Sequence, residues 1–77
     1  MPKELLAQAA KVIVSTQIGA TWLLMQELDV DFVDATHLLA ELAELGIIGG
    51  PNGSRPRDVL YRPGRIDAVI ELIQKEN

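Results

Sequence analysis

The stretch between residues 47 and 61 constrains the fold of this chain more than any other. Two short runs of strand-forming residues, 47–48 and 58–61, flank a segment dominated by glycine, proline and arginine. Within it, Pro-Asn-Gly-Ser at 51–54 favours a turn, because proline fixes its φ angle, glycine adopts positive φ and asparagine bonds to nearby backbone. The pattern predicts a β-hairpin with a long tip.

Apolar residues at helical spacing lie on both sides of this hairpin. They predict helices over residues 3–15, 22–28, 32–45 and from 66 to the end of the chain. A short extended piece, Ile18-Gly19-Ala20, is expected between the first two helices. The next connection, Asp29-Val30-Asp31, is short enough to make a tight turn.

Three residues are predicted to fix the ends of the middle helices. Thr21 and Asp31 carry side-chain oxygens that accept a free backbone N–H, so each is an N-cap candidate. Gly46 follows the third helix, where a left-handed glycine commonly ends a helix. The apolar stripe of that helix is expected to start at Phe32 and to face the core.

The order of elements is that of a winged helix-turn-helix with an added C-terminal helix. We therefore expect a mainly α fold with a small β-hairpin, formed as one winged-helix domain over residues 1–64. The helix over residues 65–77 is expected to pack on the same domain, or else to form a dimer surface. In this fold the third helix normally enters the major groove of DNA, and the hairpin, or wing, touches the backbone.

Charge is distributed unevenly along the chain, although its formal net charge is -4. Residues 1–46 carry two lysines against seven acidic residues, whereas residues 47–65 carry four arginines against one aspartate. The hairpin is therefore a basic loop between acidic elements. Because DNA presents a dense row of phosphates, the basic loop is the part of the chain best suited to contact it.

Composition excludes several classes of function. The 77 residues include no cysteine and one histidine, which excludes disulfides, thiolate metal sites and cysteine nucleophiles. No nucleophile lies at a recognisable spacing from a base, and no apolar run approaches the ~18 residues of a membrane span. We expect a cytoplasmic, non-enzymatic domain with no metal, no cofactor, no small-molecule substrate and no membrane association.

The residues around the hairpin resemble those of a known family. The resemblance is carried by residues 41–49, Glu-Leu-Ala-Glu-Leu-Gly-Ile-Ile-Gly, and by residues 53–60, Gly-Ser-Arg-Pro-Arg-Asp-Val-Leu. Both runs are similar to the γ domain of FtsK/SpoIIIE-type DNA translocases, and the similarity spans roughly residues 4–61. It implies a winged helix that binds short oriented motifs on duplex DNA, directs a motor and contacts a recombinase.

Two sets of residues are candidate contacts to double-stranded DNA. The wing set consists of Arg55, Arg57, Ser54 and Asn52. The third-helix set aligns with basic and amide residues of the family and consists of Val33, Asp34 and His37. Since a carboxylate at the start of this helix would face a polyanion, contact is expected mainly through the wing.

A protein-interaction or self-association module is the alternative interpretation. A winged helix that has lost its DNA face would use the acidic third helix to dock a basic protein partner or to mimic DNA. Its candidate contacts are Asp34, His37, Glu41 and Trp22. Trp22 is either partly packed in the core or an exposed anchor for a partner, and the C-terminal helix would form a homodimer.

Overall fold

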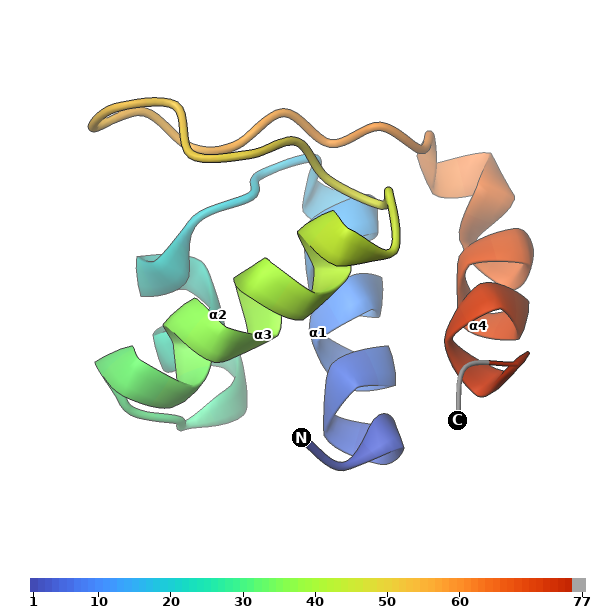
Figure 1. Ribbon diagram of the computed structural model, residues 1–77, viewed down its shortest axis with the longest axis horizontal. Helices are drawn as coiled ribbons and strands as arrows, with labels where there is room; N and C mark the ends of the chain where they lie inside the picture. Colours follow the sequence, from blue (N-terminus) through green and yellow to red (C-terminus); the bar gives the residue numbers. More distant parts are fainter. Residues whose placement is uncertain (76–77) are drawn as a thin grey trace.

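Helices form most of the structure, a computed structural model that describes residues 1–75 of the chain (Figure 1). The helices are α1 (Lys3–Thr16), α2 (Thr21–Leu28), α3 (Phe32–Glu44) and α4 (Ile66–Lys75), and a short 3₁₀ turn, η1 (Pro63–Arg65), precedes α4. The expectation of a mainly helical fold with little strand is confirmed.

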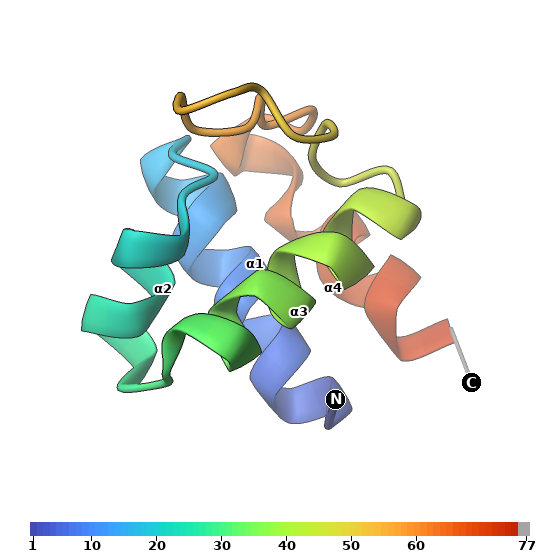
Figure 2. The same ribbon diagram turned by 60° about the vertical axis from the view of Figure 1, so that its left-hand side comes forward.

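Helix α1 lies at the centre and packs against the other three helices. In Figure 1, α2 and α3 lie on one side of α1 and α4 lies on the other, and the turned view of Figure 2 shows α3 running across α1. Burial of their apolar stripes in one core drives this arrangement. The core side chains of α1 are Leu6, Ala9, Ala10, Ile13 and Val14; α3 adds Ala35, Leu38, Leu39 and Leu42; α4 adds Val69 and Ile73.

The ends of α3 follow from its flanking residues. The Asp31 carboxylate accepts a hydrogen bond from the Asp34 backbone N–H at 2.8 Å, so the predicted N-cap is confirmed. Gly46 has φ +77°, its N–H donates to the Ala43 carbonyl, and the next N–H donates to the Leu42 carbonyl. This pair of bonds is the Schellman arrangement, and it turns the chain from α3 into the hairpin.

The N-cap predicted at Thr21 is wrong. Helix α2 begins at Thr21 itself, the preceding Ala20 is extended, and no side chain caps the helix. The extended conformation of Ala20 continues from Gly19, which pairs with the chain at Arg57. The extended segment that leads into α2 is therefore held against the chain at Arg57.

We expect the Asp31→Ala variant to lose about 1 kcal/mol of free energy of unfolding, because the Asp34 N–H then lacks its partner. Urea unfolding followed by helical circular dichroism measures the loss. Asp31→Asn is the matched control, since asparagine caps a helix about as well as aspartate. Equal stability of the Ala and Asn variants would show that the cap contributes nothing.

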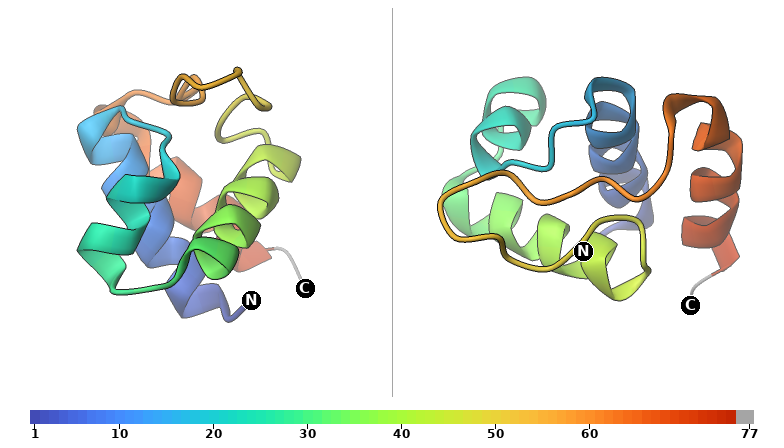
Figure 3. Two further views of the ribbon diagram at one scale, coloured as in Figure 1. Left: turned by 90° about the vertical axis from the view of Figure 1, so that its left-hand side faces the viewer. Right: turned by 90° about the horizontal axis from the view of Figure 1, so that it is seen from above.

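Where the hairpin was expected, the two arms of the chain meet at isolated antiparallel bridges. Ile48 pairs with Val59, and near the tip Asn52 pairs with Arg55. Proline has no N–H to donate to a ladder, so Pro51 and Pro56 interrupt the pairing between these bridges. We call residues 49–57 the basic loop; Figure 3 shows it covering one side of the helices, with both arms extended.

Gln17 joins α1 to the chain that leaves the hairpin. This residue ends α1 in the left-handed region, with φ +62°. Its side-chain amide donates hydrogen bonds to the Val14 carbonyl and to the Tyr61 carbonyl, both at 2.8 Å. The base of the hairpin is thereby attached to the end of the central helix.

Candidate nucleic-acid interface

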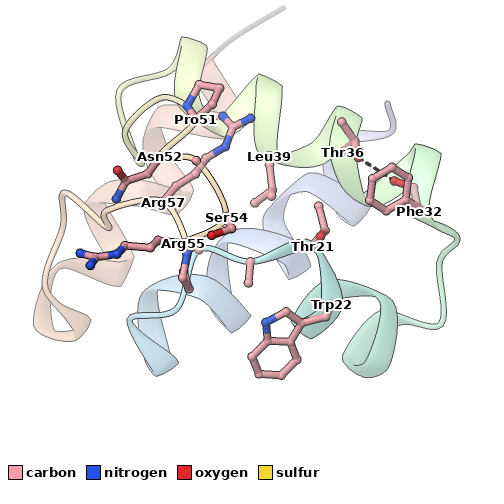
Figure 4. A pocket seen from close by; sticks show the side chains of 14 residues that line it. Thr21, Trp22, Phe32, Thr36, Leu39, Pro51, Asn52, Ser54, Arg55 and Arg57 are labelled. Atoms are coloured by element: carbon pink, nitrogen blue, oxygen red, sulfur yellow. Dashed lines mark hydrogen bonds between the residues drawn. The ribbon is translucent and has the colours of Figure 1, made fainter.

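A groove of about 300 Å³ lies between the basic loop, the start of α2 and the first half of α3. Figure 4 shows its wall residues: Trp22 on α2, Phe32 and Thr36 on α3, and the arginines of the loop on the remaining side. The residues that line it are Gly19, Ala20, Thr21, Trp22, Phe32, Thr36, Leu39, Pro51, Asn52, Gly53, Ser54, Arg55, Pro56 and Arg57. All four residues of the predicted wing set are among them.

The groove carries positive charge without a compensating carboxylate. Its described lining includes Arg55 and Arg57 and no aspartate or glutamate. Within residues 1–75, no carboxylate forms an ion pair with either guanidinium. Both side chains therefore remain available to an anionic ligand, although the chain as a whole is acidic.

Backbone pairing positions the two arginines differently. The Arg57 N–H donates to the Gly19 carbonyl at 2.8 Å, so this residue is fixed against the extended segment before α2. The Arg55 N–H donates to the Asn52 carbonyl at 3.1 Å across the turn that contains Gly53, whose φ is +62°. Arg57 is accordingly partly buried and Arg55 is exposed at the loop tip.

Helix α3 turns its acidic residues away from the groove. Phe32, Thr36 and Leu39 line the groove, and at 3.6 residues per turn Asp34 and Glu41 fall on roughly the opposite side of the helix. Glu41 instead lines a second hollow, of about 600 Å³. That hollow lies between α1, α3 and α4 and is lined by Met1, Lys3, Leu6, Glu41, Glu44, Leu45, Leu72 and Ile73.

The other candidates on α3 lie on its outward face. Val33 is 58% exposed, and His37 is also exposed, one helical turn further on. The structure does not gather the alternative partner set: Trp22 lines the groove, Glu41 lines the second hollow, and neither Asp34 nor His37 lines either of them.

The expectation that Phe32 packs in the core is wrong. Its side chain is 61% exposed, because the first turn of α3 extends past the edge of the core and the buried stripe starts at Ala35. Trp22 is likewise exposed, at 55%. Sequence spacing placed Phe32 in the apolar stripe, and nothing in the sequence marked Thr36 as a groove residue.

Other classes of site are not evident in the described part of the chain. Among residues 1–75, no group of three or more histidine, aspartate and glutamate side chains is placed to hold a metal ion. None of the described helices is both long enough and apolar enough to cross a bilayer.

The chain matches the family described as "Ftsk gamma domain" over residues 2–62. It is 40% identical over 74 residues to "DNA translocase FtsK" of Streptomyces coelicolor, which covers 96% of this chain and 8% of that protein. The same name is carried by a Streptomyces avermitilis protein, 40% identical over 73 residues, and by a Mycobacterium tuberculosis protein, 34% identical over 67 residues. These matches cover 95% and 87% of this chain, respectively, and again 8% of each relative. No solved structure matches the chain at a significant level.

Proposed function

This chain belongs to the FtsK γ-domain family, and we propose that it is a winged-helix module that binds duplex DNA mainly through its basic loop. In this proposal α2, the turn at 29–31 and α3 form the helix-turn-helix, and the basic loop is the wing. The order of these elements and the antiparallel bridges at the base of the loop support the assignment. The relatives' name, DNA translocase, supports DNA as the ligand.

The observation that carries the proposal is the pair of arginines in a groove without acidic residues. A guanidinium binds phosphate through its planar fork of N–H donors. Arg55 and Arg57 contact phosphates, while Asn52 and Ser54 add hydrogen bonds from the same loop. On α3, the exposed side chains of Val33 and His37 face the duplex. Asp34 lies on the side of the helix that is turned away from the loop.

Loss of the two arginines should reduce the salt dependence of binding. Each phosphate contact contributes about -0.9 to the slope of log K against log salt for duplex DNA. We therefore expect the Arg55→Ala/Arg57→Ala variant to bind more weakly and to reduce the steepness of this slope by about 1.8. Fluorescence anisotropy of a labelled random duplex, titrated between about 50 and 200 mM salt, measures both quantities.

A matched control is available in the same chain. Arg62 and Arg65 lie beside and within η1 and do not line the groove. The Arg62→Ala/Arg65→Ala variant makes the same change in net charge, and we expect it to keep most of the slope. If both double variants reduce the steepness of the salt dependence by the same amount, binding follows net charge alone and the groove is not the site. If the unchanged protein does not bind duplex DNA at the lowest salt, the proposed function is wrong.

A protein-interaction module remains the second candidate, and the second hollow is the observation that favours it. Its lining combines Glu41 and Glu44 with apolar side chains of α1 and α4 and with Leu45, which directly follows α3. Such a surface suits a basic, amphipathic partner or a second copy of this chain. Sedimentation velocity tests self-association, and a Glu41→Lys/Glu44→Lys variant should abolish any association that uses this hollow.

A further inference from the structure

Two large aromatic side chains stand exposed at the groove, and contact with duplex phosphates does not explain them. Trp22 is 55% exposed and Phe32 is 61% exposed, and both belong to the groove lining. Figure 4 shows them on different elements, Trp22 on α2 and Phe32 at the start of α3. Leaving this much apolar surface in water is unfavourable. A ligand that covers both rings would therefore gain binding free energy.

Cationic and hydrogen-bonding residues line the same groove. Arg55 and Arg57 lie along the loop side, and Thr21 and Thr36 lie next to the two aromatic residues. The Thr36 hydroxyl donates to the Phe32 carbonyl at 2.8 Å, which leaves its oxygen able to accept a bond from a ligand. The groove thus combines flat apolar faces, cationic groups and neutral polar groups, with no described carboxylate.

A strand of unpaired nucleotides has the complementary chemistry. Its phosphates carry negative charge, and its unstacked bases present flat faces that stack on aromatic side chains. A duplex keeps those faces inside its own stack and offers mainly phosphates and groove edges to such a site. We propose that this groove binds single-stranded DNA, with bases stacking on Trp22 and Phe32 while Arg55 and Arg57 hold the phosphates.

This inference shares the two arginines with the proposed function and adds a base-stacking component that salt does not screen. Loss of an arginine contact reduces the salt slope, by about 0.7 per contact for a single strand. Loss of a stacking contact lowers affinity at every salt concentration and leaves the slope unchanged. The two contributions can therefore be separated in one set of titrations.

The intrinsic fluorescence of Trp22 reports on binding at the groove, because Trp22 is the one tryptophan of the chain. We expect a thymidine oligonucleotide of about 12 nucleotides, within the size range of single-strand sites, to quench the Trp22 fluorescence as it binds. Labelled oligonucleotide anisotropy gives the affinity of the variants. Trp22→Leu is expected to weaken single-strand binding about tenfold, in line with one lost stacking contact, and to leave the salt slope unaltered.

Phe32→Leu is the second variant, with a smaller loss expected in the same direction. Leu60→Ala is the matched control, since Leu60 is 59% exposed and lies outside the groove. Thermal unfolding of each variant confirms that the fold is kept; both aromatic residues are on the surface, so we expect no large change.

The outcomes separate the inference from the proposed function. Quenching by the oligonucleotide, with the loss on Trp22→Leu, supports the inference. Duplex binding without single-strand binding, or single-strand binding unaffected by Trp22→Leu, overturns the inference and leaves the proposed function standing. Absence of binding to both nucleic acids overturns both. If an acidic peptide that contains tyrosine quenches the Trp22 fluorescence as strongly as the oligonucleotide and displaces it, the groove binds a protein ligand instead.

Discussion

The Ile73→Ala variant is expected to lose about 2–5 kcal/mol of free energy of unfolding. Ile73 is 1% exposed and belongs to the common core, where α4 packs on α1. Truncation removes buried apolar surface and leaves a cavity that its neighbours fill only in part. At ~0.05–0.15 kcal/mol per residue, a domain of this size has about 4–12 kcal/mol of stability, so the loss is a large share of the total.

Urea unfolding followed by circular dichroism measures this loss, and Leu60→Ala is the control. Leu60 is 59% exposed, so its truncation should change stability by less than about 0.5 kcal/mol. If Ile73→Ala proves too unstable to study, Ile73→Val should still lose about 0.5–1.5 kcal/mol. A change no larger than that of Leu60→Ala would mean that α4 does not contribute to the core in solution.

The result also bears on the extent of the domain. The family match ends at residue 62, whereas α4 begins at Ile66. Among the described helices α1 packs most closely against α4, and Val69 and Ile73 of α4 belong to the same buried cluster as the apolar residues of α1. We therefore propose that the folding unit of this chain includes the helix after the matched region.

The helices could be predicted from the sequence because burial imposes their period. Leu38 and Leu42 recur at the spacing that places one face of α3 against α1, and Gly46 ends that helix through its positive φ. The interior of a helix follows such a rule more closely than its first turn. Phe32 has the right spacing for the core, but it is the first residue of α3 and remains exposed, and the buried stripe starts one turn later at Ala35.

The site was predictable in part. The arginines at 55 and 57 were evident from the charge of one segment, since a turn-rich loop keeps its charges on the surface. Which residues of α3 face that loop was not evident, because it depends on the rotation of the helix about its axis. Packing of Leu38 and Leu42 sets this rotation and turns Asp34 and Glu41 away from the groove.

Gly19→Ala is expected to disturb stability and DNA binding together. A Cβ atom at residue 19 would lie 2.6 Å from the Arg57 carbonyl oxygen and 3.3 Å from the Arg57 Cβ atom. Backbone cannot swing aside as a flexible side chain does, so the paired segments must separate. Overpacking of this kind typically lowers the free energy of unfolding by about 1–3 kcal/mol, and here it also breaks the hydrogen bond between the Arg57 N–H and the Gly19 carbonyl.

Gly50→Ala is the matched control in the same hairpin. No atom lies within 4 Å of a Cβ built at residue 50, and its φ is not in the positive region. We expect it to leave the free energy of unfolding unchanged, or to raise it by up to about 1 kcal/mol through the less flexible unfolded chain. Urea unfolding and duplex anisotropy are measured on both variants.

The two readouts distinguish how the structure accommodates the clash. If the helices hold and the loop swings out, Arg57 leaves the groove, so duplex affinity and the salt slope should fall while most of the stability remains. If the extended segment before α2 shifts instead, stability should fall by the larger amount. Gly19→Ala behaving like Gly50→Ala in both measurements would mean that residues 19 and 57 do not pair in solution, and the position of Arg57 in the groove would then lack its support.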